Sequence, residues 1–201
     1  MHCLTLERFA SRGLDPIDLT LSRGECVTLT GPSGCGKSLF LRAIADLDPH
    51  QGDCLLGDER RSLTPPPVWR RQVGLLPAES HWWEDRVGDH FVDGESHLTG
   101  ALGFPEECMD WEVSRLSSGE RQRLSLARLL AGYPKVLLLD EPTANLDKAN
   151  TNRVEELILT YLREQGASAL WVSHDPEQRH RMATHRGLRF ADRQLSPEIW
   201  S

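Results

Sequence analysis

The chain has 201 residues, of which 39% are hydrophobic and 26% charged, the proportions of an ordinary globular protein. This length fits one large domain and can bury a core without disulfides or a structural metal. The formal net charge is −7, with both signs mixed along the chain, which weighs against the basic face that nucleic-acid binding requires. We therefore expect no nucleic-acid partner.

The sequence offers no candidate for a membrane span or a secretory signal. The longest apolar run, 136–139, is far shorter than the ~20 residues that cross a bilayer. Glu7 and Arg8 come before any apolar region of a signal peptide could form. The five cysteines include no C-x-x-C pair, so we expect neither a zinc site nor a disulfide framework. A reducing, cytoplasmic location follows.

Apolar runs and helical patterns alternate along the chain. Short strands are predicted at 14–21, 26–30, 53–56, 73–76, 136–140 and 169–173. One-face apolar patterns predict helices from Lys37 to about Leu47, from Ser118 towards Leu130, and over 154–162 with a stop at Gly166. Strands alternating with helices predict an α/β fold with a mainly parallel sheet. The irregular, polar stretch 79–115 is interpreted as a small helical insertion.

A glycine-rich loop follows the predicted strand 26–30 and opens the next helix. Its sequence fits G-x-x-x-x-G-K-[ST] and comprises Gly31, Pro32, Ser33, Gly34, Cys35, Gly36, Lys37 and Ser38. Glycines let the backbone approach phosphates closely, and the helix N-terminus favours an anion. Lys37 can reach the β- and γ-phosphates and Ser38 can ligate Mg²⁺. The loop predicts a nucleoside triphosphate site.

Two carboxylates stand at the tip of the apolar strand 136–140. Asp140 is placed to hold Mg²⁺ through water. Glu141 points elsewhere and can accept a proton from an attacking water. The pair predicts that the nucleotide is hydrolysed.

The segment 116–122 reads Leu-Ser-Ser-Gly-Glu-Arg-Gln. A Ser-Ser-Gly helix start offers free N–H groups and hydroxyls to an anion, which makes it a second phosphate site. Two such sites make sense if the second serves the nucleotide of a partner. The segment resembles the LSGGQ signature of ATP-binding-cassette (ABC) ATPases, and the order of motifs along the chain is also that of the family.

The resemblance implies a P-loop NTPase of ABC type over residues 1–201. Its core would be a RecA-like, mainly parallel sheet with an N-terminal antiparallel β subdomain and a helical subdomain at about 79–131. Two chains, by default a homodimer, would hold two ATP molecules head to tail and drive an integral-membrane permease from the cytoplasmic face of the cell membrane. The resemblance makes Asp147 a contact across the dimer and His174 the residue that orients the water. Nucleotide contacts would come from the loop and from Leu39, Ser117, Ser118, Gly119 and Glu120.

Some positions depart from the family pattern. Where the family usually has a glutamine after the strand 73–76, this chain has Ala78, so that either Glu79 contacts the Mg²⁺ or water alone does. Phe9 is the candidate to stack on adenine, with a core role as the alternative. Trp82 and Trp83 cannot both point inward, which leaves permease contact and subdomain packing as alternatives. A nucleotide-gated interaction module with weak or no hydrolysis is the alternative function.

Overall fold

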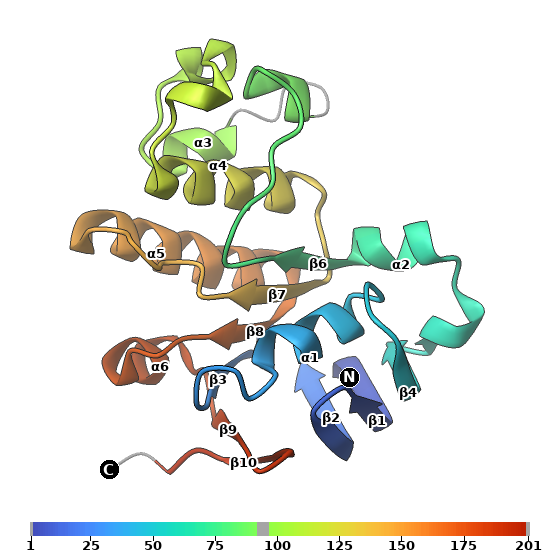
Figure 1. Ribbon diagram of the computed structural model, residues 1–201. Helices are drawn as coiled ribbons and strands as arrows, with labels where there is room; N and C mark the ends of the chain where they lie inside the picture. Colours follow the sequence, from blue (N-terminus) through green and yellow to red (C-terminus); the bar gives the residue numbers. More distant parts are fainter. Residues whose placement is uncertain (1, 92–96, 200–201) are drawn as a thin grey trace.

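The computed structural model describes residues 2–91 and 97–199, which form two sheets with helices around them (Figure 1). The larger sheet has six strands. In spatial order they are β10 (Gln194–Pro197), β9 (Gly187–Ala191), β3 (Cys26–Thr30), β8 (Ser168–Val172), β7 (Val136–Asp140) and β6 (Val73–Leu76). The strands from β9 to β6 pair in parallel, and β10 is antiparallel to β9. The predicted α/β fold with a mainly parallel sheet is confirmed.

The smaller sheet is antiparallel and comes from the N-terminal part of the chain. Its order is β2 (Leu14–Ser22), β1 (His2–Ser11), β4 (His50–Leu56) and β5 (Glu59–Arg60). The strand β1 is not among those predicted from the sequence. Its pairing with β4 shifts register between Glu7 and Ala10, and Arg8 has a positive φ of 45°. This irregularity interrupts the two-residue alternation by which strands are recognised.

Helices cover both faces of the six-stranded sheet and form a separate end of the molecule (Figure 1). The α-helices are α1 (Lys37–Ile44), α2 (Pro66–Gln72), α3 (His97–Ala101), α4 (Ser118–Ala131), α5 (Lys148–Gln165) and α6 (Pro176–Met182). Single 3₁₀ turns are η1 (Arg61–Leu63), η2 (Gly88–His90), η3 (Glu106–Asp110) and η4 (Val113–Arg115). Within 79–131, the described residues contain no strand longer than the isolated bridge between Arg86 and Glu112. Among the described residues, no helix is long and apolar enough to cross a bilayer.

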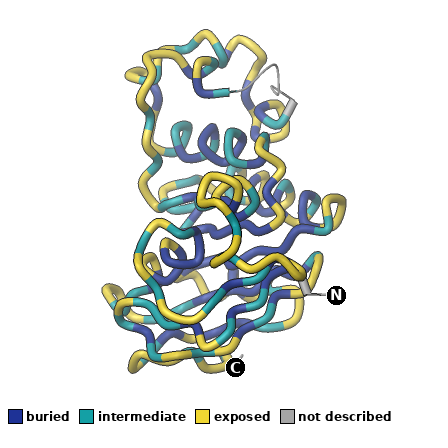
Figure 2. The backbone as a smooth tube through the Cα atoms, turned by 90° about the vertical axis from the view of Figure 1, so that its right-hand side faces the viewer, coloured by how far each residue is buried: buried dark blue, intermediate teal, exposed yellow. Residues whose placement is uncertain are grey.

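Alternation along the parallel strands divides the core into two layers. In β7, Val136 and Leu138 face the layer that contains α1 and the antiparallel sheet. Leu137 and Leu139 face the opposite layer, which contains α4 and α5. Figure 2 shows buried backbone through the sheets and exposed loops at the helical end. Because both faces are covered, the carboxyl ends of the parallel strands are where the sheet presents side chains to ligands.

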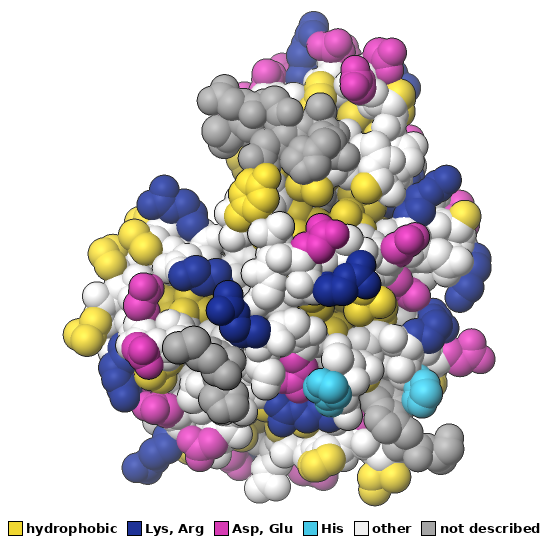
Figure 3. Space-filling view, turned by 180° about the vertical axis from the view of Figure 1, so that it is seen from behind, with side chains coloured by type: hydrophobic (Ala, Val, Ile, Leu, Met, Phe, Trp, Pro, Cys, Tyr) yellow, Lys and Arg dark blue, Asp and Glu magenta, His cyan; other side chains and the backbone are white. Residues whose placement is uncertain are grey.

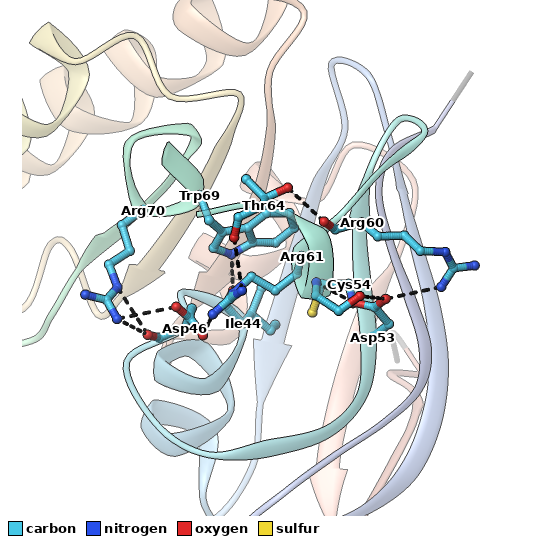
Figure 4. A network of polar contacts seen from close by, with 10 residues as sticks. Ile44, Asp46, Asp53, Cys54, Arg60, Arg61, Thr64, Trp69 and Arg70 are labelled. Atoms are coloured by element: carbon cyan, nitrogen blue, oxygen red, sulfur yellow. Dashed lines mark hydrogen bonds and ion pairs between the residues drawn. The ribbon is translucent and has the colours of Figure 1, made fainter. Parts of the chain in front are cut away.

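The C-terminal end of α1 is fixed by contacts with α2 and η1 (Figure 4). The buried Trp69 indole donates to the carbonyl oxygen of Ile44 at 2.9 Å. Arg70 donates to the carbonyl of Asp46 at 2.9 Å, and Arg61 forms an ion pair with the Asp46 carboxylate. These contacts satisfy carbonyls that a helix end leaves without partners. The helix that follows the glycine-rich loop is therefore anchored at its far end.

Candidate nucleotide site

The glycine-rich loop lies between β3 and α1 and is packed against β9. Gly31 has a φ of 154°, and a Cβ added there would lie 2.3 Å from the carbonyl oxygen of Phe190. Gly36 has a φ of 113°, a backbone conformation that residues other than glycine rarely adopt. Lys37 is almost fully buried, and its ammonium donates to the carbonyl oxygens of Gly31 at 2.9 Å and Pro32 at 3.0 Å. The loop thus wraps around the ammonium group.

The N-terminus of α1 is open for an anion. Its N-cap is Gly36, and no side chain caps it. By contrast, the side chains of Ser117, Asp147 and Asp175 cap α4, α5 and α6. The first N–H groups of α1 therefore need an external acceptor, and together with Lys37 they favour a phosphate.

The loops that follow β7 and β8 bring together two of the three side chains predicted to be catalytic, the third being Lys37. Glu141 has a positive φ of 50°, and its N–H donates to Val172 in β8 at 3.2 Å. Its Oε1 lies 3.0 Å from Nε2 of His174. Asp140, one residue earlier, is almost fully buried at the end of β7. The carboxylate of Glu141 is thus oriented by a histidine, an arrangement suited to a general base.

The signature segment starts α4 as a complete capping box. The Ser117 Oγ accepts from the N–H of Glu120 at 3.3 Å, while Glu120 Oε2 accepts from the Ser117 N–H at 2.8 Å and the Ser117 hydroxyl at 2.7 Å. These bonds, first that from the backbone N–H of Ser117, lower the pKa of Glu120 below its usual value. Glu120, which stands where the family motif has glutamine, therefore has a structural role in its own helix.

The loop before α5 packs against this helix start. Asp147 caps α5 by accepting from the N–H of Asn150 at 2.8 Å. A Cβ added to Gly119 would lie 2.9 Å from Cδ2 of Leu146. The signature segment and the loop that carries Asp147 are therefore in direct contact, while Ser118 is exposed.

Comparison with known proteins agrees with this geometry. Residues 14–144 match the family described as ABC transporter. The probable iron export ATP-binding protein FetA of Escherichia coli (strain K12) is 38% identical over an alignment of 178 positions, which covers 82% of this chain and 79% of that protein. The chain belongs to the ABC transporter family.

The names of other relatives state different transported substances. The aliphatic sulfonates import ATP-binding protein SsuB of Zymomonas mobilis subsp. mobilis is 37% identical over 81% of this chain and 69% of that protein. The Fe(3+) ions import ATP-binding protein FbpC of Streptomyces avermitilis is 33% identical over 96% of this chain and 61% of that protein. These names share the description of an ATP-binding protein of a transport process.

Solved structures share the ABC fold. A dimeric ATP-binding cassette in a post-hydrolysis state, bound to ADP and Pi, aligns with a TM-score of 0.84 at 22% identity, over 97% of each chain. A bacterial Atm1-family ABC exporter with ATP bound aligns with a TM-score of 0.82 at 21% identity, over 96% of this chain and 38% of that one. The predicted fold class is confirmed.

The structure of the ABC chain corrects one predicted nucleotide contact. Phe9 is fully buried, and its ring packs on Phe40 and stacks on His50 with ring centroids 4.9 Å apart. No face of the ring is open to adenine, so Phe9 belongs to the core. The turn between β1 and β2 lies beside the glycine-rich loop instead, since the Arg12 carbonyl oxygen would be 3.6 Å from a Cβ added to Gly36.

The loop after β6 holds the position where the ABC family usually has glutamine. Glu79 is exposed there. Gln122 of α4 donates to the carbonyl of Pro77 at 3.0 Å and so ties this loop to the helical end. Among the described residues, no group of three His, Cys, Asp or Glu side chains could hold a metal ion. The hydroxyl of Ser38 and the carboxylate of Asp140 are oxygen donors, the type of ligand that Mg²⁺ prefers.

A groove of about 850 Å³ is lined by residues of α1, α2, β6 and α4 and of the loops next to them in the ABC chain. Apolar residues of β6 and α4 line it together with Arg42, Arg70 and Arg128. Trp83, 68% exposed, also lines it, whereas Trp82 packs against the core. The Arg128 guanidinium lies over both indole rings, 4.7 and 4.8 Å from their centroids. One tryptophan thus packs inward and the other faces the groove.

Proposed function

We propose that two copies of this chain bind two ATP molecules between them and drive a separate integral-membrane permease from the cytoplasmic face of the membrane. The observation that carries this proposal is the contact between Glu141 and His174 at the carboxyl ends of β7 and β8, on the same sheet as β3 and its phosphate loop. The sheet thus carries both an anion site and an oriented general base, and hydrolysis of a phosphoanhydride needs both.

In this proposal, each part of the site has one task. The loop from Gly31 to Ser38 and the start of α1, including Leu39, bind the phosphates through backbone N–H groups and Lys37. Ser38 and Asp140 hold Mg²⁺, which offsets the charge that develops on the phosphate oxygens. Glu141 accepts a proton from the attacking water, and His174 keeps the carboxylate in place.

The second phosphate contact comes from the other copy. The N–H groups of Ser118 and Gly119 lie in the first turn of α4, where a helix attracts anions. Ser118 is exposed, so that a partner's nucleotide can approach it. Asp147 lies in the adjoining loop and would face the same partner. This supports a head-to-tail homodimer in which each ATP lies between the phosphate loop of one copy and the signature segment of the other.

The groove beside Trp83 is the proposed contact for the permease. It is lined partly by apolar residues of β6 and α4 and carries an exposed tryptophan, the type of residue that often anchors an interface. Basic and acidic side chains are interspersed over the face seen in Figure 3, which is not the single-sign surface of a nucleic-acid binder. The relatives' names include both import and export and different cargoes, so that ATP binding and transport are what the names share, which supports an ATP-driven transport role for this chain.

The test compares the purified chain with Glu141→Gln. We expect Mg²⁺-dependent ATP hydrolysis by the wild type and a loss of about 10²-fold or more in kcat for the variant, the scale of a general base. Light scattering with and without ATP should show an ATP-dependent dimer of the variant, because it binds ATP but hydrolyses it slowly. Binding of ATP by neither protein would refute the proposal, and full activity of Glu141→Gln would remove Glu141 as the base.

A further inference from the structure

Gln178 is a buried amide that no motif of the sequence pointed to. It lies in α6, outside the residues that match the family, and only 4% of it is exposed. Buried side-chain amides are retained where their hydrogen bonds are satisfied. The groups that hydrogen-bond to the Gln178 amide therefore indicate its role.

The Gln178 amide makes four hydrogen bonds, two at each end. Its Oε1 accepts from the Ser173 hydroxyl at 2.7 Å and from the Trp171 indole at 3.4 Å. Its Nε2 donates to Thr143 Oγ1 at 2.8 Å and to Glu155 Oε1 at 2.9 Å. An indole N–H can only donate and a carboxylate can only accept, so that the orientation of the amide is fixed.

These bonds join the two loops that carry the catalytic pair. Thr143 lies two residues after Glu141, and Ser173 directly precedes His174. Ser173 Oγ also accepts from the N–H of Asp175 at 3.1 Å, so that His174 is held on both sides. We infer that Gln178 is a positioning residue, which fixes the loops after β7 and β8 relative to one another and thereby sets the contact between Glu141 and His174. This inference rests on the proposed roles of those two residues.

The chemistry of the site calls for glutamine rather than glutamate. Glu155 accepts from Gln178 and is paired with Arg181, whose Nη2 lies 2.9 Å from Glu155 Oε1. A carboxylate at position 178 would face the Glu155 carboxylate at about the present 2.9 Å, and both residues are more than nine-tenths buried. Like charges buried at this distance repel strongly. The substitution Gln178→Glu keeps the shape of the side chain and replaces the amide N–H donor with a charged carboxylate oxygen.

The decisive experiment exchanges the amide and the carboxylate. Gln178→Glu should lower kcat for ATP hydrolysis by about 10- to 100-fold, the cost of misplacing a catalytic group, with KM for ATP within about twofold. Adding Glu155→Gln should restore most of kcat, because the amide introduced at position 155 can donate to the carboxylate at position 178 and accept from Arg181. A residue that only stabilised the fold would lower the melting temperature without this pattern of loss and rescue.

A second pair of variants tests the same link from the other loop. Thr143→Val removes the hydroxyl with little change in shape and should also lower kcat, whereas Thr143→Ser should not. Gln194→Glu, which adds a charge at an exposed position of β10, is the matched control and should behave as the wild type.

Unchanged kcat in Gln178→Glu and Thr143→Val, or no recovery in the exchanged double variant, would overturn the inference. If those variants are unchanged while Glu141→Gln and His174→Ala are inactive, the proposed function stands and only the role of Gln178 falls. Should Glu141→Gln keep full activity, the proposed catalytic pair fails, and the role of Gln178 with it.

Discussion

His174 Nε2 lies 3.0 Å from Glu141 Oε1, although the two residues are more than thirty positions apart in the sequence. They meet because β7 and β8 are neighbours in the parallel sheet, with Asp140 paired to Val172. The carboxyl ends of both strands therefore end at the same edge. The contact restricts the Glu141 side chain, which is otherwise about one third exposed.

Removing this contact should slow hydrolysis more than it weakens binding. We expect His174→Ala to lower kcat for ATP by about 10²-fold, since it takes away the group that orients the base, and to leave KM for ATP within a few fold. Steady-state ATPase assays would check this. His174→Gln, which can still donate to the carboxylate, should retain more activity than His174→Ala, and equal activity of both variants with the wild type would contradict the assignment.

The contact between Gly119 and Leu146 predicts an effect on pairing of two chains. Gly119→Ala would bring a Cβ to 2.9 Å from Leu146 Cδ2, so that the leucine must move and the loop before α5 shifts against α4. We expect ATP-dependent dimerisation to weaken several-fold in sedimentation experiments. Gly100→Ala in α3 is the matched control, because nothing lies within 4 Å of its added Cβ. Equal dimerisation by the two variants would show that the contact has no part in pairing.

The capping box of α4 predicts a pH-dependent stability. The hydrogen bonds from Ser117 lower the pKa of Glu120 from its ordinary value of 4.5. A carboxyl whose pKa is lower in the folded state stabilises the protein above the unfolded pKa, and this contribution is lost as the pH falls through the folded pKa. Relative to Glu120→Gln, the wild type should gain up to about 1 kcal/mol in the free energy of unfolding at pH 7.

Urea unfolding at pH 7 and in steps below pH 4.5 would measure this difference, which should shrink as Glu120 takes up a proton. Glu164→Gln, at an exposed position near the end of α5, provides the comparison and should show little pH dependence. A difference that stays constant with pH would mean that the carboxylate charge does not contribute to the cap.

Much of the fold could be predicted because its strands and helices have clear local boundaries. The strands at 26–30, 73–76 and 136–140 have the predicted bounds, since each is a short apolar run. The strand predicted at 169–173 lies one residue earlier at both ends, at Ser168–Val172, and follows the Gly166 cap of α5 closely. The helix stop at Gly166 is confirmed by its left-handed conformation, with a φ of 62°.

The rest depends on contacts that the sequence does not encode locally. Phe9 is the best candidate for an adenine contact by its distance from Lys37 along the chain, but its ring is enclosed because β1 and β4 pair around it and His50 covers one face. Gln178 was overlooked because a single polar residue in a short helix carries no periodic signal. Its partners come from four separate elements or loops, and only tertiary structure brings them together.

The contacts of Trp69, Arg70 and Arg61 fix the end of α1, so that this short helix connects the glycine-rich loop to the groove. An eight-residue helix is about 12 Å long. One end carries Lys37 of the glycine-rich loop. Beyond the other end, Leu47 lines the groove, and Arg70 donates to the carbonyl oxygen of Asp46. A partner that displaces Arg70 would tilt α1. Because α1 follows the phosphate loop directly, the loop would shift with it, and no other element would have to move in between. Mechanical strain could thus pass in either direction between the groove and the nucleotide through a single helix.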